Sequence, residues 1–158
     1  MLEKEDELLQ EKATAQCFDK LVPLRDILSL VVVAHLFVEY WLEWLIRDSL
    51  KRPEKLLDSG LTFSQKLAVA ESMGLLQGEL LEAVRAVNKI RNKVVHNLAY
   101  KATPEDLRLL AKFVPTLNSE QQLISEKLGS PKYEIVTFCM YFAGYAVGFT
   151  CGLRESRK

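Results

Sequence analysis

One stretch decides how this chain folds, Arg85-Ala-Val-Asn-Lys-Ile-Arg-Asn-Lys-Val-Val-His-Asn97. Apolar residues recur in and beside it at steps of three and four, namely Ala83, Val87, Ile90, Val94 and Leu98. This spacing predicts an amphipathic helix from about Glu79 to Leu98 that buries the stripe. On a neighbouring face, Asn88, Asn92 and His96 follow one another at steps of four, and Arg91 precedes Asn92. A core does not need these polar side chains, so this face is the candidate functional site.

Composition restricts the class of protein. With 158 residues and no net charge, the chain is expected to form one soluble domain without the basic bias of a dedicated nucleic-acid binder. Residues 85–112 are nevertheless locally basic, with seven Lys and Arg against Glu105 and Asp106, so a polyanion would bind there. The sequence begins Met-Leu-Glu-Lys-Glu-Asp-Glu, which is acidic where a signal peptide is basic, and we therefore expect a cytoplasmic location.

The remaining segments also favour helices, because Gly and Pro are few and long runs are rich in Leu, Val, Ala, Glu and Lys. We expect a single all-α domain over residues 1–158, an antiparallel helical bundle with short accessory helices. The predicted helices cover residues 2–20, 25–51, 62–73 and 79–98, then one that starts at Thr103-Pro104, one that ends at Leu128, and 131–153. We expect the N-terminal helix, residues 1–22, to be peripheral and loosely docked, and residues 131–154 to form an apolar core helix.

The helix over residues 25–51 is apolar almost all round and is predicted to be the centre of the bundle. Its aromatic residues Tyr40, Trp41 and Trp44 could stack on bases, but aromatic side chains on a core helix usually pack, and we predict that they do. Leu36 and Phe37 belong to the same predicted core. The cysteines, Cys17, Cys139 and Cys151, are expected to be small buried hydrophobes.

The last helix has an alternative interpretation as a membrane span. It has no charge between Ile135 and Leu153, and Gly144, Gly148 and Gly152 are spaced four apart, as in helices that associate in membranes. Interspersed Tyr and Thr residues dilute its hydrophobicity. We favour a buried core or dimer helix, in which the glycines let two helices pack closely, and expect no membrane partner.

Three residues of the central stretch suggest a chemistry. Arg91 offers a charged planar fork for phosphate oxygens, the imidazole of His96 can pass protons, and Asn92 can orient a phosphate or hydroxyl group. Together they suit metal-independent cleavage of RNA, in which a histidine moves the proton of the ribose 2′-OH or of the leaving oxygen while the arginine stabilises the charge at phosphorus.

Helix geometry adds a condition to this chemistry. Residues five apart lie about 140° apart around a helix, so one copy does not bring Arg91 and His96 together. A two-fold dimer could build the site from both chains. The alternative is purely structural, with His96 stabilised by the helix dipole and Asn97 ending the helix.

At this point the residues resemble a known family. The segment Leu81–Leu98, with Asn-Lys-Ile-Arg-Asn-Lys-Val-Val-His at its centre, resembles the R-x4-H signature of the HEPN superfamily. Residues 63–76 look like the preceding helix of HEPN-like bacterial proteins related to the mannitol operon repressor, and His35-Leu-Phe-Val-Glu39 fits the same arrangement. The resemblance spans roughly residues 28 to 112, and the corresponding HEPN-like core is 25–112.

The resemblance implies a helical bundle that dimerises near the motif. Many HEPN members are metal-independent ribonucleases of toxin–antitoxin or defence systems, and others are regulatory modules without catalysis. By this resemblance Arg91 and His96 would be catalytic, and Asn92 the polar residue that follows the arginine. The mannitol repressor branch generally lacks the intact motif, so its presence favours the nuclease.

Further candidates complete the predicted site. His35 and Glu39 are one turn apart on an otherwise apolar helix and, with Asn88, either support the site or bond to each other in the bundle. Arg85, Lys89 and Lys93 are candidate phosphate or RNA ligands. We expect neither a metal, because two histidines have no third ligand at a suitable spacing, nor a cofactor.

Three functional hypotheses therefore follow from the sequence. The first is a cytoplasmic homodimeric endoribonuclease that acts on RNA through Arg91 and His96. The second is a non-catalytic regulator, for example of transcription, that binds a protein partner, and an antitoxin would be such a partner for the nuclease. A third hypothesis, a membrane-tethered protein, rests only on residues 135–153.

Overall fold

The computed structural model describes residues 2–97, 99–114 and 119–156, and within them it contains helices and no strand. The all-α class is therefore confirmed. The helices are α1 (Leu2–Leu21), α2 (Ile27–Ser49), α3 (Glu54–Leu57), α4 (Phe63–Ser72), α5 (Gly78–His96), α6 (Pro104–Ala111), α7 (Ser119–Leu128) and α8 (Lys132–Ser156). Helix α3 is a single turn in the segment between the predicted helices over 25–51 and 62–73, where no helix is predicted.

Local sequence explains where these helices begin and end. Thr62 and Gln65 form a capping box at the start of α4, because the Gln65 amide donates to Thr62 Oγ1 at 3.3 Å and the Thr62 amide donates to Gln65 Oε1 at 2.9 Å. Thr103 and Asp106 form a second capping box at the start of α6. Gly74 follows α4 with a φ of +71°, a conformation that favours glycine.

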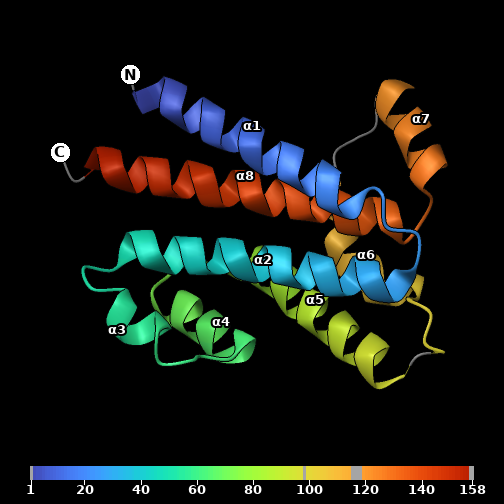
Figure 1. The fold of residues 1–158 in the computed structure, drawn as a ribbon, viewed down its shortest axis with the longest axis horizontal. Helices are drawn as coiled ribbons and strands as arrows, with labels where there is room; N and C mark the ends of the chain where they lie inside the picture. Colours follow the sequence, from blue (N-terminus) through green and yellow to red (C-terminus); the bar gives the residue numbers. More distant parts are fainter. Residues whose placement is uncertain (1, 98, 115–118, 157–158) are drawn as a thin grey trace.

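Three long helices, α1, α2 and α8, form the larger layer of the molecule, with α1 running opposite to α2 and α8 (Figure 1). Helix α8 packs against both α1 and α2, while α4 and α5 pack on the other side of α2 and α6 bridges α5 and α8. The core between them contains Trp41, Leu42, Phe138 and Phe142, all nearly inaccessible to solvent. The site-bearing helix α5 is thus fixed directly to the central helix α2.

The N-terminal helix is packed more closely than expected. Ala13, Cys17 and Leu21, at steps of four along α1, are buried, and Cys17 Sγ donates to the carbonyl of Val136 on α8 at 3.7 Å. Lys132, at the start of α8, donates from Nζ to backbone carbonyls in the connection between α1 and α2. Helix α1 is therefore an integral layer of the bundle along this part of its length.

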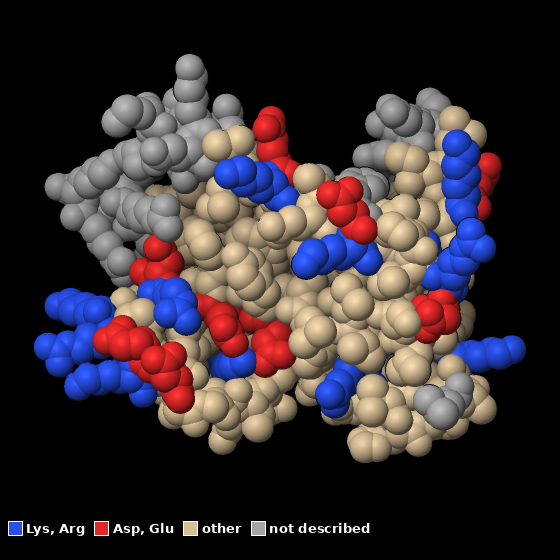
Figure 2. Space-filling model, viewed as in Figure 1, with Lys and Arg blue, Asp and Glu red and all other residues tan. Residues whose placement is uncertain are grey.

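Two expectations about buried residues are wrong. Leu36 and Tyr40 of the central helix are 57% and 52% exposed, because they lie on the face of α2 that α5 and α8 leave open. Figure 2 shows uncharged surface between α1 and α2, interrupted by neighbouring basic and acidic side chains. Trp41 is buried as expected. Gly148 and Gly152 are exposed, and a Cβ at either would meet nothing within 4 Å, so neither glycine serves close packing between helices of the same chain.

Helices α2 and α8 are each long and apolar enough to cross a membrane by length and composition. Core helices of soluble proteins meet the same criteria. In this fold both helices contribute to a common core, and α8 buries residues along most of its length, from Ile135 to Thr150.

Candidate functional site at the end of helix α5

Helix α5 separates the two faces that its sequence predicted. Ala83, Val87, Ile90 and Val94 are buried against the bundle, and Leu98 lies outside the described residues. The helix is continuous from Gly78 to His96. Arg91 and His96 therefore keep the angular separation of a regular helix, and one chain does not bring the two side chains together.

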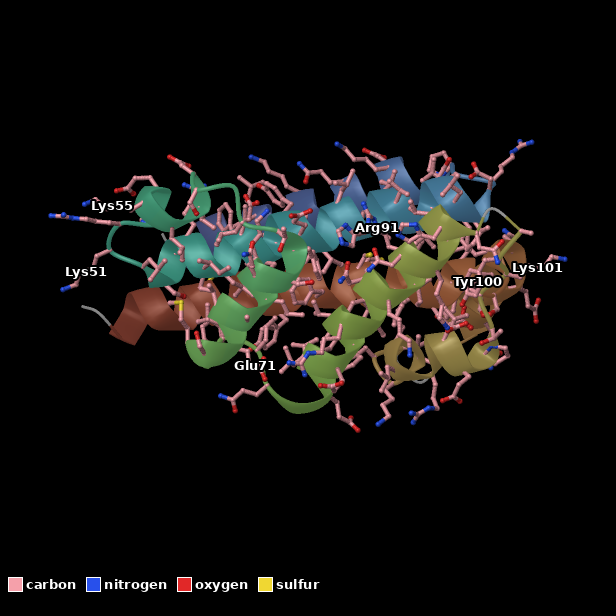
Figure 3. The ribbon with its side chains drawn as sticks, turned by 90° about the horizontal axis from the view of Figure 1, so that it is seen from below. Lys51, Lys55, Glu71, Arg91, Tyr100 and Lys101 are labelled. Carbon is pink, nitrogen blue, oxygen red and sulfur yellow. The ribbon has the colours of Figure 1, made fainter. Side chains whose placement is uncertain are left out.

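Arg91 is half-buried where α5 crosses α2 (Figure 3). Its Nη1 donates to Asn92 Oδ1 at 2.9 Å, which leaves most of the guanidinium donors available. No carboxylate in the described ranges forms an ion pair with Arg91. An arginine held by a neutral amide keeps its full charge for an anionic ligand.

His96 is exposed in the last turn of α5, and its ring makes no hydrogen bond with the residues that the structure describes. Asn97 does end the helix, as expected, but it does so with extended backbone, and its Oδ1 accepts from the Ala99 amide at 3.1 Å. Helix termination thus depends on Asn97, whereas the imidazole of His96 is open to solvent.

The other predicted phosphate ligands differ from Arg91. Arg85 pairs with Glu82 at 2.5 Å and with Glu71 at 2.7 Å. The hydrogen bond that Arg85 donates to Glu82, with the charges of both glutamates, raises the pKa of Arg85 against a smaller effect of burial. The guanidinium of Arg85 is therefore occupied by Glu71 of α4 and Glu82 of α5 and is not free to bind a phosphate.

Lys93 is neutralised in the same way by α6. Its Nζ lies 2.5 Å from Asp106 Oδ1 and 5.5 Å from the centre of the Tyr100 ring. The pKa of Asp106 lies far below its ordinary value, because hydrogen bonds from Lys93, Tyr100 and Thr103 outweigh the effect of burial. Lys89 is exposed and forms no ion pair within the described part of the chain. Arg85 and Lys93 would each have to break an ion pair in order to bind a phosphate, whereas Lys89 would not.

His35 and Asn88 join α2 to α5. His35 Nε2 lies 3.1 Å from Asn88 Oδ1, and the amide group of Asn88 reaches Ser64 of α4 at 3.5 Å. Burial lowers the pKa of His35 below its usual 6.5, Arg91 and Lys66 act in the same direction, and Asn88 and Glu39 oppose them. A neutral His35 must donate from Nε2 to the amide oxygen. His35 and Asn88 are therefore engaged in a joint between helices.

Lys66 is a residue of this joint that the sequence analysis did not identify. It is 8% exposed, and its Nζ lies 2.6 Å from Glu39 and 2.5 Å from Glu43 of α2. A signal was present, because Lys66 falls between Phe63 and Ala70 on the stripe of α4 that is otherwise apolar and buried. A charged residue on such a stripe predicts a buried partner.

The arrangement leaves one open group of polar side chains, which we call the Arg91 face and define as Arg91, Asn92, Val95 and His96. It can hold an anion at Arg91 and move a proton at His96, but in one copy it cannot do both to one substrate. No cluster of metal-ligating side chains occurs within the described ranges. No protein-family model, curated protein or solved structure matches the chain.

Proposed function

We propose that this protein is a HEPN-like, metal-independent endoribonuclease of the cytoplasm whose active site is shared between two copies of the chain. The observation that carries the proposal is the contrast at Arg91. Its guanidinium is half-buried and bonded to the neutral Asn92, whereas Arg85 and Lys93 on the same helix are paired with carboxylates. A half-buried arginine without a carboxylate is poised for an anion.

The chemistry uses Arg91 and His96 as phosphate ligand and proton carrier. Neutral His96 takes the proton of a ribose 2′-OH, O2′ forms a bond to phosphorus, and the bond from phosphorus to the 5′ oxygen breaks. The departing oxygen takes a proton from solvent. Arg91 stabilises the additional negative charge on the phosphoryl oxygens. The products are a 2′,3′-cyclic phosphate and a 5′-hydroxyl end.

A second copy is required because Arg91 and His96 diverge on one helix. Val95 lies between them in the sequence, one turn beyond Arg91, and is 39% exposed. Pairing of the Arg91 faces about a two-fold axis would bury Val95 against its counterpart and set Arg91 of one copy near His96 of the other. The HEPN-like arrangement of the bundle, in which α1 runs antiparallel to α2 and α8, is part of this proposal.

A specific observation favours the alternative, a non-catalytic regulator resembling the mannitol operon repressor. Carboxylates already neutralise Arg85 and Lys93, so the surface around Arg91 has few cations left to hold RNA. In this alternative the Arg91 face binds an acidic group of a protein partner, such as an antitoxin or a regulator.

The experiment that tests the proposal is RNA cleavage in the presence of EDTA. Full-length wild type, Arg91→Ala and His96→Ala are incubated with single-stranded RNA, and the ends of the products are analysed. Arg108→Ala serves as the control, because Arg108 is an exposed cation of α6 paired with Glu105. Cleavage by wild type and the control, but by neither of the other variants, supports the nuclease. Equal cleavage by all four proteins, or by none, contradicts it.

A further inference from the structure

A groove of about 690 Å³ runs between α1 and α2, on the side of α2 away from α5. It is lined by Gln16, Lys20, Val33, Leu36, Phe37 and Tyr40. None of these residues belongs to the Arg91 face. Its floor and one wall are apolar, and Lys20 is the charged residue among the lining residues that the structure describes. The groove therefore needs an explanation separate from the proposed RNA chemistry.

Beside the groove stands a ridge formed by Leu36 and Tyr40, one turn apart on α2. More than half of each side chain is exposed, which is unusual for a central helix. Ridge and groove are adjacent, and on the α2 side they make one apolar area of Val33, Leu36, Phe37 and Tyr40. Contiguous apolar surface of this kind marks an interaction site.

Charges of opposite sign flank this area. On the α2 side, Glu39 and Glu43 share the single cation Lys66, so the strip keeps one net negative charge, and the Glu43 side chain is 35% exposed. On the α1 side, Lys20 lines the groove and supplies a positive charge. Across the face, the acidic strip of Glu39 and Glu43 comes first, followed by the apolar ridge, the apolar groove and then the basic wall, which is formed by Lys20.

We propose that a second copy of this chain docks on this face, ridge into groove. A two-fold interface must be self-complementary. Rotation about an axis along the helices, between ridge and groove, reverses the order across the face. It places each ridge in the partner groove and each acidic strip opposite a basic wall. The α2 helices of the two copies then run in the same direction, because an axis across the helices would set acid against acid.

This interface is distinct from the pairing of Arg91 faces. Helix α5 packs on the His35 side of α2, and the groove lies on the Val33 and Phe37 side. The proposed axis therefore leaves the two Arg91 residues on opposite edges of the pair. A chain with both interfaces forms a closed tetramer or an extended array, depending on how the two axes meet.

The first test measures mass by light scattering in a Val95→Asp background, which removes any pairing through the Arg91 face. We expect a pair of chains, and Leu36→Asp should reduce the mass twofold. Leu123→Asp is the matched control, because Leu123 on α7 has the same 57% exposure and lies outside the groove. A single chain up to roughly 100 µM, or equal effects of both aspartates, overturns the proposal.

The second test exchanges the charges that are expected to face each other. Lys20→Glu and Glu43→Lys should each weaken association by about tenfold or more, and the double variant should recover it. The double variant carries the same disturbance of Lys66 as Glu43→Lys, so recovery excludes misfolding as the cause. No recovery in a folded double variant contradicts the predicted register. If the wild-type protein remains monomeric and binds an added amphipathic peptide, the groove is a site for a helix of another protein. That result would overturn the proposal.

Either result is independent of the ribonuclease. If RNA cleavage is absent but Leu36→Asp halves the mass, the proposed function fails and this interface stands. If cleavage is present and Leu36→Asp changes nothing, the reverse holds.

Discussion

The two halves of α5 carry similar polar side chains but meet different neighbours. In the first half, Arg85 and Asn88 face α4, which supplies Glu71 and Ser64 as partners. In the second half, α4 no longer covers the helix, and Arg91 and His96 have no carboxylate partner within the described residues. The comparison teaches that a polar stripe on a helix is functional or structural according to what the fold places opposite each residue.

The largest expected effect is on RNA cleavage, and it concerns the second half of α5, which α4 does not cover. Arg91→Ala and His96→Ala should each reduce RNA cleavage by about a hundredfold or more, because each removes a group that acts on the reacting phosphate. Mixing the two inactive variants should restore about a quarter of the wild-type rate, since half of the random dimers have one of two sites intact. The measurement is the initial rate of cleavage after subunit exchange. A mixture that remains inactive after exchange would place the site within one chain.

The next largest effect concerns the first half of α5, which α4 covers, and the buried cation Lys66 that α4 carries. Lys66→Met should lower the free energy of unfolding by about 3 kcal/mol, because Glu39 and Glu43 are left close together without their cation. Denaturant titration measures the change. A triple variant with Lys66→Met, Glu39→Gln and Glu43→Gln should recover much of the loss, because no buried charge then remains without a partner. If the triple variant is no more stable than the single one, the loss comes from packing.

A smaller effect is expected in the pH dependence of stability. The pKa of His35 is lower in the folded state than the ordinary 6.5, mainly because of burial, so the unfolded chain binds the proton more readily. Stability from neutral His35 is therefore present above pH 6.5 and is lost as the pH falls from there towards the folded pKa. His35→Gln, which keeps a donor for Asn88, should flatten the unfolding curve in this range. A curve as steep as that of wild type would show that another group titrates.

The smallest effect is expected at Arg85. Its ion pairs with Glu71 and Glu82 are nearly half exposed, and salt screens such pairs. Arg85→Ala should lower the melting temperature by much less than Lys66→Met, and the difference from wild type should shrink in 1 M salt, as thermal unfolding would show. A large loss that is insensitive to salt would mean that Arg85 anchors α4 through packing.

The sequence predicted most of the helices because their signals are local. The apolar spacing of α5, the capping boxes at Thr62 and Thr103 and the stop at Gly74 each depend on residues within one or two turns. The exposure of Leu36 and Tyr40 could not be predicted in this way, because α2 is apolar on nearly all sides and only the tertiary packing decides which side stays open.

The same distinction applies to the candidate site. Spacing selected Arg91, Asn92 and His96 as one group, and the structure leaves their polar face accessible. Spacing did not show that Glu71 and Asp106, from other helices, would neutralise Arg85 and Lys93. Ion pairs between helices depend on partners distant in the sequence, for which periodicity has no signal.

The packing of α1 along α8 has a consequence for how the chain acquires its structure. Lys132 donates a hydrogen bond to the carbonyl of Val22 at a sequence separation of 110, and Cys17 donates to the carbonyl of Val136 at a separation of 119. Contacts of such long range form late, after the loop between them has been closed at an entropic cost. During synthesis the apolar face of α1 therefore stays uncovered until α8 has emerged from the ribosome. In this interval the nascent chain is most prone to aggregate or to bind a chaperone.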